Sequence, residues 1–185
     1  MSSPPHNLQL VIDFVNTLDV ETGEDRTDTP AQLAQWLGEQ GLRGGDEPGL
    51  GEAELAQAIG LRESLRTVLV SHNQRDPADD KDTHHLGEVA ERGLLSVCFG
   101  PGGEIEIAPR AGGYPGVLAQ LLVPVTHAGM DGSWARVKAC AADDCQWAFY
   151  DSSRNRSGRW CDMAVCGNRE KVRTYRSRQP EERSG

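Results

Sequence analysis

The chain has 185 residues, of which 25% are charged and 37% are hydrophobic, and its formal net charge is −9 at pH 7. This length suits one ordinary domain, or a domain of about 130 residues with a small module attached. The segment Met1–Pro4 lacks the basic start and apolar core of a secretory signal, and the apolar runs fall far short of the roughly 18 residues that a membrane span requires. We therefore expect a soluble cytoplasmic protein with no membrane partner.

The charge is unevenly distributed along the chain. Residues 1–133 hold 8 Lys or Arg against 21 Asp or Glu, a net charge of −13, whereas residues 134–185 hold 11 against 7, a net charge of +4. Attraction to phosphate acts within about a Debye length, roughly 8–10 Å. The local excess of cations is therefore a better guide to partners than the acidic total.

The first patterned segment, His6–Asp19, fits either a helix or a strand. Apolar residues follow helical spacing at Leu8, Val11, Ile12, Val15 and Leu18, and follow strand alternation at Leu8, Leu10, Ile12 and Phe14. We predict a helix. On a helix, Asp13, Asn16 and Thr17 share one side, where they are either buried polar groups satisfied by the chain itself or a small ligand-binding patch.

Two further helices are predicted before the middle of the chain. Thr29 and Pro30 form a standard helix entry, a cap followed by proline in the first turn. A longer helix is predicted from Glu52 to Asn73, with apolar residues at three- and four-residue steps at Leu55, Ile59, Leu65, Val68 and Leu69. Its charged residues Arg62, Glu63 and Arg66 are interpreted as a solvated face, with pairing of the arginines to Asp13 as the alternative.

The middle of the chain predicts an acidic loop, a hairpin and flanking helices. The expected elements are a loop at 76–82, a helix at 86–92, β-prone runs at 94–99 and 104–109, and a helix at 116–127. The last helix is expected to cover the hairpin and to kink or end at Pro124. Cys98, within the first β-prone run, is expected to be buried as a small apolar residue.

Four cysteines, Cys140, Cys145, Cys161 and Cys166, form two pairs with four intervening residues in each. Pairs at this spacing bring thiolates onto one tetrahedral zinc ion. Two disulfides are the alternative, but nothing resembles a secretory signal, and the pattern in a reducing compartment favours metal. We therefore predict one structural Zn²⁺ held by these four residues.

The segments around the cysteines predict a treble-clef layout, in which a hairpin supplies one pair of ligands and the start of a helix the other. Strands are expected at 134–140 and 147–150, a polar loop at 151–158 and a helix at 163–179. The fold class is thus α+β, with a mainly helical N-terminal domain containing a small hairpin at residues 1–132 and a zinc finger at 133–185. A module this small needs its metal in order to fold.

Cations gather on the predicted finger and indicate a nucleic-acid surface. At 100° per residue, Arg169, Arg173 and Arg176 form one stripe, with Val165, Val172 and Tyr175 on the inward side. The candidate DNA contacts are Arg154, Arg156, Arg159, Arg169, Lys171, Arg173, Arg176 and Arg178. Arginine and lysine suit phosphates, and arginine also suits guanine edges. The alternative is a solvated basic helix end.

Several of these motifs resemble a known family. Cys140-x4-Cys145, Trp160-Cys161 and Cys166-Gly167-Asn168-Arg169 resemble the CGNR zinc finger, and the N-terminal part resembles the ABATE domain through residues 14–17, 36–37 and 61–63. The resemblance covers nearly the whole chain. It implies a transcription regulator with a DNA-binding finger and an N-terminal domain that senses stress or a small ligand.

Two functional hypotheses follow. In the first, the finger binds double-stranded DNA, the N-terminal domain receives a small-molecule effector or stress signal, and a homodimer compensates for the few phosphates that one finger contacts. In the second, the zinc site is only a structural support and the basic helix meets an acidic protein. An enzyme is not expected, because four protein ligands leave no metal position for an activated water.

Overall fold

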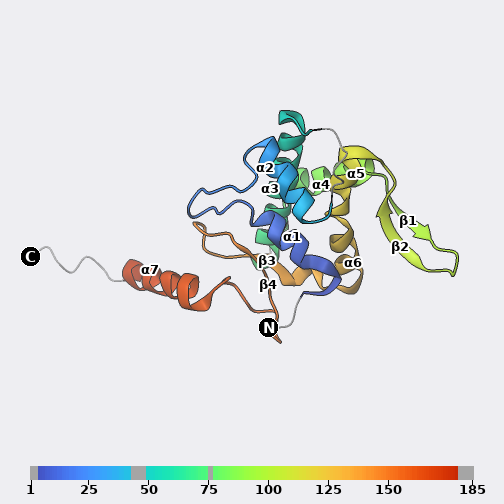
Figure 1. Ribbon diagram of the computed structural model, residues 1–185. Coiled ribbons are helices and arrows are strands. Elements are labelled where there is room, and N and C mark those ends of the chain that lie inside the picture. Colours follow the sequence, from blue (N-terminus) through green and yellow to red (C-terminus); the bar gives the residue numbers. More distant parts are fainter. Residues whose placement is uncertain (1–3, 43–48, 75–76, 179–185) are drawn as a thin grey trace, which may run out of the picture.

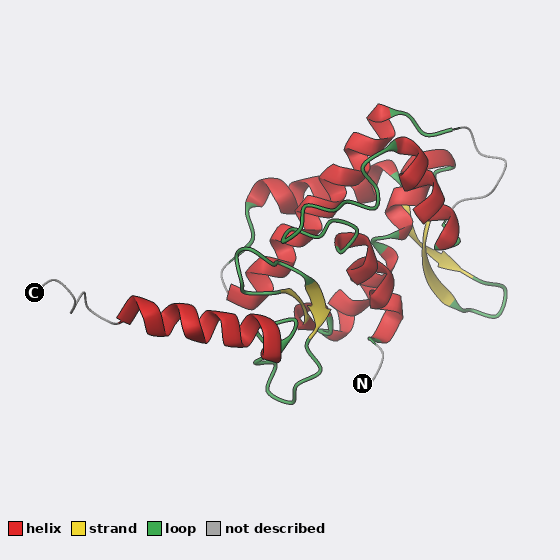
Figure 2. Ribbon diagram, turned by 60° about the vertical axis from the view of Figure 1, so that its left-hand side comes forward, coloured by secondary structure: helices red, strands yellow, loops and turns green. Residues whose placement is uncertain are grey.

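The computed structural model describes residues 4–42, 49–74 and 77–178 (Figure 1). In chain order the elements are η1 (Pro5–Asn7), α1 (Leu8–Val15), α2 (Pro30–Glu39), α3 (Glu52–Gln74), α4 (Asp80–Arg92), β1 (Leu95–Phe99), β2 (Ile105–Pro109), α5 (Gly113–Gln120), α6 (Val123–Asp131), η2 (Trp134–Arg136), β3 (Val137–Ala139), β4 (Ala148–Tyr150), η3 (Met163–Gly167) and α7 (Asn168–Arg178). Helices form the body, and α7 and the β1–β2 hairpin project from opposite sides of it (Figures 1 and 2). The mainly helical α+β class is confirmed.

Helix α1 lies in the core and is buried on more than one side. Leu8, Val11 and Val15 are fully buried. Phe14, on another side of the helix, packs on Trp36 with the ring centroids 5.3 Å apart. The predicted helix is confirmed, and its ambiguous pattern has a physical reason. A helix surrounded by the core needs apolar residues nearly all round, which also produces a run of alternating apolar positions.

The prediction that Arg62 and Arg66 lie on a solvated face of α3 is wrong. Both side chains are buried. Arg62 lies 2.8 Å from the carboxylate of Asp25 in the loop after α1, and Arg66 donates to the carbonyl of Val15 at 2.7 Å. Glu63 accepts from both guanidinium groups. Buried charge is tolerated here because each guanidinium has both an acid and neutral oxygen acceptors.

Helix α4 begins earlier than predicted. Asp79 caps it by accepting from the backbone N–H of Lys81 at 3.1 Å, and Asp80 and Asp82 lie in its first turn. Part of the segment predicted as an acidic loop is therefore helix. The positive end of the helix dipole stabilises acids in the first turn, so the same charges that suggested a loop favour this helix start.

The helix predicted over residues 116–127 is two helices, α5 and α6, and it covers the hairpin only in part. Pro124 lies in the first turn of α6, where its missing N–H costs nothing. Leu95, at the base of the hairpin, packs against the core. Phe99 and Ile105, at the far end, are exposed. The prediction that this hairpin is covered is therefore wrong beyond its base.

The β3–β4 hairpin belongs to the core of the helical body. Val137 and Ala139 of β3 and Ala148 of β4 are buried in the same cluster as residues of α1 and α3. Side chains of α3 also form hydrogen bonds with the backbone along the outer edge of β3, the edge that does not pair with β4. His72 Nδ1 donates to the carbonyl of Val137 at 2.8 Å, and Asn73 Nδ2 donates to the carbonyl of Ala139 at 2.6 Å.

The outer edge of β4 forms hydrogen bonds with the residue that follows α1. Asn16, directly after this helix, donates from Nδ2 to the carbonyl of Ala148 at 2.9 Å and accepts the backbone N–H of the same residue at 2.7 Å. The amide side chain thus takes the place of a third strand. Packing is consequently continuous across the domain boundary expected between residues 132 and 133.

Candidate metal centre and nucleic-acid interface

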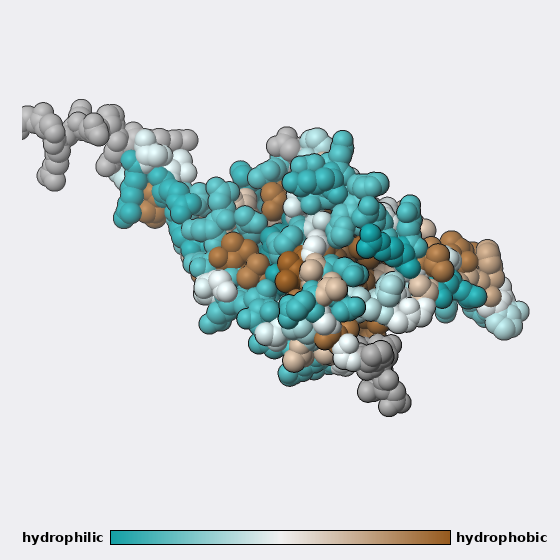
Figure 3. All heavy atoms as spheres, turned by 90° about the horizontal axis from the view of Figure 1, so that it is seen from above, coloured by the Kyte–Doolittle hydropathy of each residue, from teal (hydrophilic) through white to brown (hydrophobic). Residues whose placement is uncertain are grey.

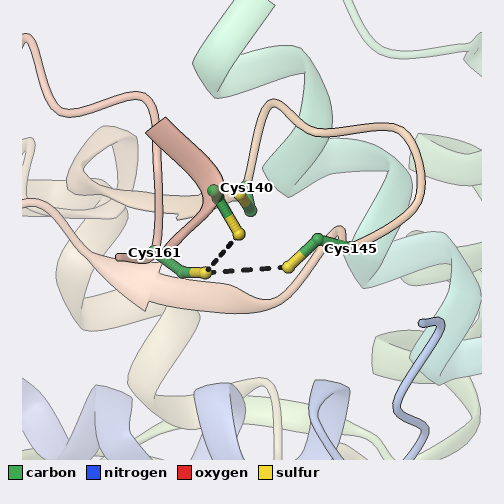
Figure 4. A group of neighbouring side chains, drawn as sticks. Cys140, Cys145 and Cys161 are labelled. Atoms are coloured by element: carbon green, nitrogen blue, oxygen red, sulfur yellow. Dashed lines mark hydrogen bonds between the residues drawn. The ribbon is translucent and has the colours of Figure 1, made fainter. Parts of the chain in front are cut away.

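Four cysteines from separate parts of the C-terminal segment meet at one point. Cys140 follows β3, Cys145 lies in the turn before β4, Cys161 lies in the loop after β4, and Cys166 lies in η3. Their sulfur atoms all lie within 4.8 Å of one another. Figure 4 shows Cys140, Cys145 and Cys161 pointing toward a common centre.

The sulfur geometry fits one tetrahedral zinc ion. With Zn–S bonds of about 2.3 Å, neighbouring sulfurs in a tetrahedron lie about 3.8 Å apart. The Sγ atom of Cys161 lies 3.6 Å from that of Cys145 and 3.7 Å from that of Cys166. These are free thiols rather than disulfides. Four protein sulfurs fill a tetrahedral site, which is the arrangement of structural zinc.

The thiols of the cluster differ in acidity. Burial alone would raise the pKa of Cys140, but hydrogen bonds from the backbone N–H groups of Ala142 and Cys161 lower it. Burial, together with the neighbouring charge of Cys140, outweighs the hydrogen bond from the N–H of Trp147 and raises the pKa of Cys145 to about 12. Burial is also the main cause of the raised pKa of Cys161, followed by repulsion from Cys140. The two thiols with a raised pKa keep their protons at neutral pH unless a metal replaces them. The site therefore suits Zn²⁺, which binds thiolates.

Backbone hydrogen bonds hold the two cysteine pairs together. The N–H of Cys140 donates to the carbonyl of Trp147 at 2.9 Å and closes the turn that carries the first pair. The N–H of Ala141 donates to the carbonyl of Arg159 at 2.9 Å and joins this turn to the approach of the second pair. The chain itself thus positions both pairs around the place that one ion would take.

The tetrapeptide Cys166-Gly167-Asn168-Arg169 has a structural use at each position. The cysteine is a metal ligand. A Cβ atom at the glycine would lie 2.6 Å from the sulfur of Met163, so only glycine fits without a shift. The asparagine donates to a backbone carbonyl one turn back at 3.0 Å. The arginine places Nη2 3.5 Å from the cysteine sulfur and thus lies against the metal centre.

The loop between the two cysteine pairs is built on a buried ion pair that sequence reasoning missed. Lys138 Nζ lies 2.7 Å from the carboxylate of Asp151, and the residues are 5% and 3% exposed. Lys138 also donates to the carbonyls of Arg156 and Gly158 at 2.8 and 3.0 Å. The pair thus gives residues 151–159 a defined shape. A lysine in a strand and an aspartate in a loop carry no spacing that marks them as partners.

Helix α7 stands clear of the body, and its predicted inward side is exposed. Val165, Val172 and Tyr175 were expected to face inward, yet all three are exposed and Tyr175 reaches 65%. That prediction is wrong because α7 continues from η3 away from the helical body (Figures 1 and 2). A partner can therefore approach α7 from several sides.

Most of the predicted DNA contacts reach solvent. The exposed members are Arg154, Arg156, Arg159, Lys171, Arg173 and Arg176. Arg178 ends α7, and its side chain lies outside the part of the chain that the structure describes. Three exposed cations thus come from the loop built on Lys138 and three from α7, so the structure presents two basic elements.

Arg169 and Arg173 are engaged by acids. Arg169 donates to both carboxylate oxygens of Glu21 at 2.6 and 3.2 Å. Arg173 lies 3.1 Å from Asp144 and 2.6 Å from Glu170. The first two members of the predicted arginine stripe are therefore paired with acids of the protein itself, although Arg173 stays exposed. Sequence reasoning missed the first pairing because 148 residues separate its partners.

The three candidate ligand-binding residues after the N-terminus have separate roles. Asn16 is buried and bonds the edge of β4. Thr17 is buried and accepts from Arg62 at 3.1 Å. Asp13 is partly exposed and accepts from Gln9 at 2.8 Å. Buried polar groups satisfied by the chain, one of the two predicted alternatives, describe Asn16 and Thr17.

Comparison with known proteins assigns most of the chain. The model of the ABATE family, described as "Putative stress-induced transcription regulator", matches residues 8–143, and the model of the CGNR zinc finger matches residues 136–179. No curated protein matches the chain. In the described residues, no helix combines the length and apolar character needed to cross a membrane. The chain therefore belongs to the ABATE family and carries a CGNR zinc finger with four cysteines in position to hold one zinc ion.

Proposed function

We propose that this protein is a cytoplasmic transcription regulator that binds double-stranded DNA through its zinc finger. The observation that carries the proposal is α7, a projecting helix with exposed Lys171, Arg173 and Arg176. A helix with its side chains is about 10–12 Å across, and the major groove is about 12 Å wide. With 11 residues, α7 is about 16 Å long, which suits insertion into one groove.

The loop at residues 151–159 supplies the second contact in this proposal. Arg154, Arg156 and Arg159 are exposed, and the backbone that carries them is held by Lys138 and Asp151. A loop already held in shape loses little conformational entropy on binding. We assign phosphates to these arginines, while α7 contacts base edges, because phosphate contacts fix register and base contacts specify sequence.

In the same proposal, the N-terminal domain receives a ligand or stress signal. Arg66, Asn16 and Glu21 support this role, since each links the helical body to the finger. A movement of α1 or of the loop after it would therefore reach the metal centre directly. We propose no catalytic role for the metal, because four cysteine ligands leave no position for water or substrate.

A second candidate is a protein-interaction adaptor. Val165, Val172 and Tyr175 are exposed along η3 and α7, and apolar residues among cations also fit a groove on an acidic protein. DNA remains the first choice because the cations of the loop and helix outnumber these residues.

Selection from random DNA duplexes distinguishes the two candidates. We expect enrichment of a defined motif by the wild-type protein. Replacing Lys171 and Arg176 by Ala should abolish the enrichment, because these are the exposed cations of α7 without an acid partner among the pairs that the structure describes. Replacing Arg154 and Arg156 by Ala should instead weaken binding to all sequences and reduce its salt dependence by about one to two phosphate contacts.

The matched control is Arg92→Ala, which removes an exposed arginine at the end of α4. It should leave both enrichment and affinity unchanged. Equal recovery of all duplexes by the wild-type protein would count against sequence readout and favour the adaptor.

Glu21→Gln should strengthen DNA binding. The substitution removes the nearer of the two carboxylates beside Arg169 and leaves Asp144 at 3.5 Å, so the cation becomes more available to DNA. Exposed ion pairs are weak because water and salt screen them, so affinity should rise by no more than about fivefold, as measured by fluorescence anisotropy. Glu24→Gln, in the same loop, removes the same charge without touching Arg169 and should have a smaller effect. Equal effects of the two substitutions would mean that net charge alone matters.

A further inference from the structure

A groove of about 490 Å³ lies between α7 and the segment just before the second cysteine pair. Arg159 and Trp160 line it from that segment, and residues between Gly167 and Tyr175 line it from η3 and α7. The latter follow one another at helical spacing and share one side of the helix. The predicted arginine stripe lies on the opposite side and lines a separate cavity. We call the first cavity the aromatic groove, after Trp160 and Tyr175.

The indole of Trp160 is fixed by its surroundings. It packs against the cysteine cluster, and the guanidinium carbon of Arg159 lies over the ring, 5.5 Å from the ring centroid. A Cβ atom at Gly167 would lie 3.1 Å from Cδ1 of the indole, so a side chain there would crowd the ring. A ring that is held in place before binding loses little conformational entropy when a ligand stacks on it.

A second ring and two cations complete the aromatic groove. Tyr175 is exposed, and Lys171 is exposed one turn before it on the same side of α7. Arg159 is exposed beside Trp160. The acid that lines the groove, Glu170, has its carboxylate 2.6 Å from Arg173, which matches its charge. Aromatic rings with adjacent cations are the combination that binds single-stranded nucleic acids, since bases stack on the rings and phosphates bind the cations.

A second cavity, of about 340 Å³, shares Arg159 with the aromatic groove. Arg156, Ser157 and Gly158 also line it, from the loop that Lys138 holds in shape. No acidic residue lines this cavity within the part of the chain that the structure describes. Consecutive phosphates of one strand can therefore pass from the groove into this cavity along Arg159.

From these rings and cations we propose that the aromatic groove binds single-stranded nucleic acid, with unpaired bases stacked on Trp160 and Tyr175 and phosphates bound by Arg159 and Lys171. A duplex keeps the faces of its bases inside its own stack, so it cannot use the two rings in this way. The site lies on the side of α7 away from the arginine stripe. It does not require the duplex binding proposed above.

Other kinds of ligand suit the aromatic groove less well. A cationic ligand would be repelled by Arg159 and Lys171, which line the groove. An apolar protein segment would need an apolar surface around the groove. Figure 3 instead shows mainly hydrophilic atoms on the part of the molecule that projects with α7. Single-stranded DNA and RNA share the required chemistry, and the experiment distinguishes between them.

Fluorescence anisotropy of the full, zinc-loaded chain tests the proposal with labelled oligothymidine and oligouridine of about 12 nucleotides, within the usual site sizes of single-strand binders. We expect the wild-type protein to bind at least one of them. Tyr175→Leu should weaken this binding by about tenfold or more, because leucine keeps an apolar side chain but cannot stack on a base. The same variant should bind a blunt duplex like the wild type.

Val172→Ser is the matched control. Val172 is exposed on α7 but lines the cavity of the arginine stripe instead of the aromatic groove. The control should bind single strands like the wild type, and both variants should keep the zinc content and circular dichroism of the wild type. Photocross-linking of an oligonucleotide that carries 5-iodouracil, read by mass spectrometry, should place the link on Trp160 or Tyr175.

Three results would overturn the proposal: no binding of either oligonucleotide by the wild-type protein, equal binding by the wild type and Tyr175→Leu, or cross-links confined to residues outside the groove. Displacement of the oligonucleotide by polyglutamate at equal charge concentration would also overturn it, because charge alone would then explain the binding. A protein that enriches a duplex motif without binding single strands would contradict this inference alone. Single-strand binding without duplex enrichment would contradict only the function proposed above.

Discussion

Replacing Cys161 by Ser, or removing zinc with a chelator, is expected to unfold the C-terminal residues from Cys161 through α7 while the β3–β4 hairpin stays folded. Structural zinc in finger peptides contributes apparent free energies of about 10–16 kcal/mol, so its loss should be decisive for the segment that depends on it. Helix α7, with 11 residues, is too short to persist without an attachment. By contrast, β3 is bonded by His72 and Asn73 on α3.

Hydrogen exchange read peptide by peptide is the measurement for this prediction. Amides of residues 161–178 should lose protection in the variant, whereas those of residues 137–139 should keep it. Cys98→Ser removes the cysteine that is not a ligand and should change neither zinc content nor exchange. Loss of protection throughout the helical body would show that the metal stabilises the whole fold instead.

Lys138→Met should lower the free energy of unfolding by about 3–5 kcal/mol, because it leaves the carboxylate of Asp151 buried without its cation. Urea denaturation followed by tryptophan fluorescence measures this loss. Lys81→Met removes an exposed lysine whose partner, Asp79, is also exposed, and should leave the free energy of unfolding nearly unchanged. A loss below about 1 kcal/mol for the Lys138 variant would mean that water reaches the pair.

The pH dependence of this difference follows from Asp151. Burial alone would raise the pKa of its carboxyl, but Lys138 and the N–H groups of Ser153 and Gly158 outweigh burial and lower the pKa to about 2. The stabilisation is therefore complete above the unfolded pKa of about 3.8 and is lost as the pH falls toward 2. The gap between wild type and Lys138→Met should shrink over this window. Acid effects on the metal centre are common to both proteins and cancel in the comparison.

The metal centre was predictable from the sequence because one ion constrains the spacing of its ligands, and the cysteine pairs show that constraint directly. Most helices were predictable from apolar periodicity. Buried charge was not, since Arg62 and Arg66 have the helical spacing of a surface face. Only the fold reveals the loop acid beside Arg62 and the carbonyls at the end of α1 beside Arg66.

The basic surface was predictable in composition but not in detail. Periodicity placed Arg169 and Arg173 on one stripe, yet the acids that engage them include Glu21 from the other end of the chain. Periodicity also predicted that Val172 faces inward, because the prediction assumed that every helix packs one side against the rest of the protein. Helix α7 breaks that assumption because it leaves the body at its first turn.

Polar side chains from α3 and from the end of α1 protect both edges of the β3–β4 hairpin. Backbone groups along the border of a sheet invite strands from other molecules, and this is the usual route into fibrous aggregates. Asn16 and Asn73 form hydrogen bonds with such backbone groups on the two outer edges of the β3–β4 hairpin. Strands of other molecules therefore cannot pair with these groups. Substitution of Asn16 by an aliphatic residue would leave the edge of β4 open and is therefore expected to cause aggregation during synthesis, before any regulatory activity could be measured.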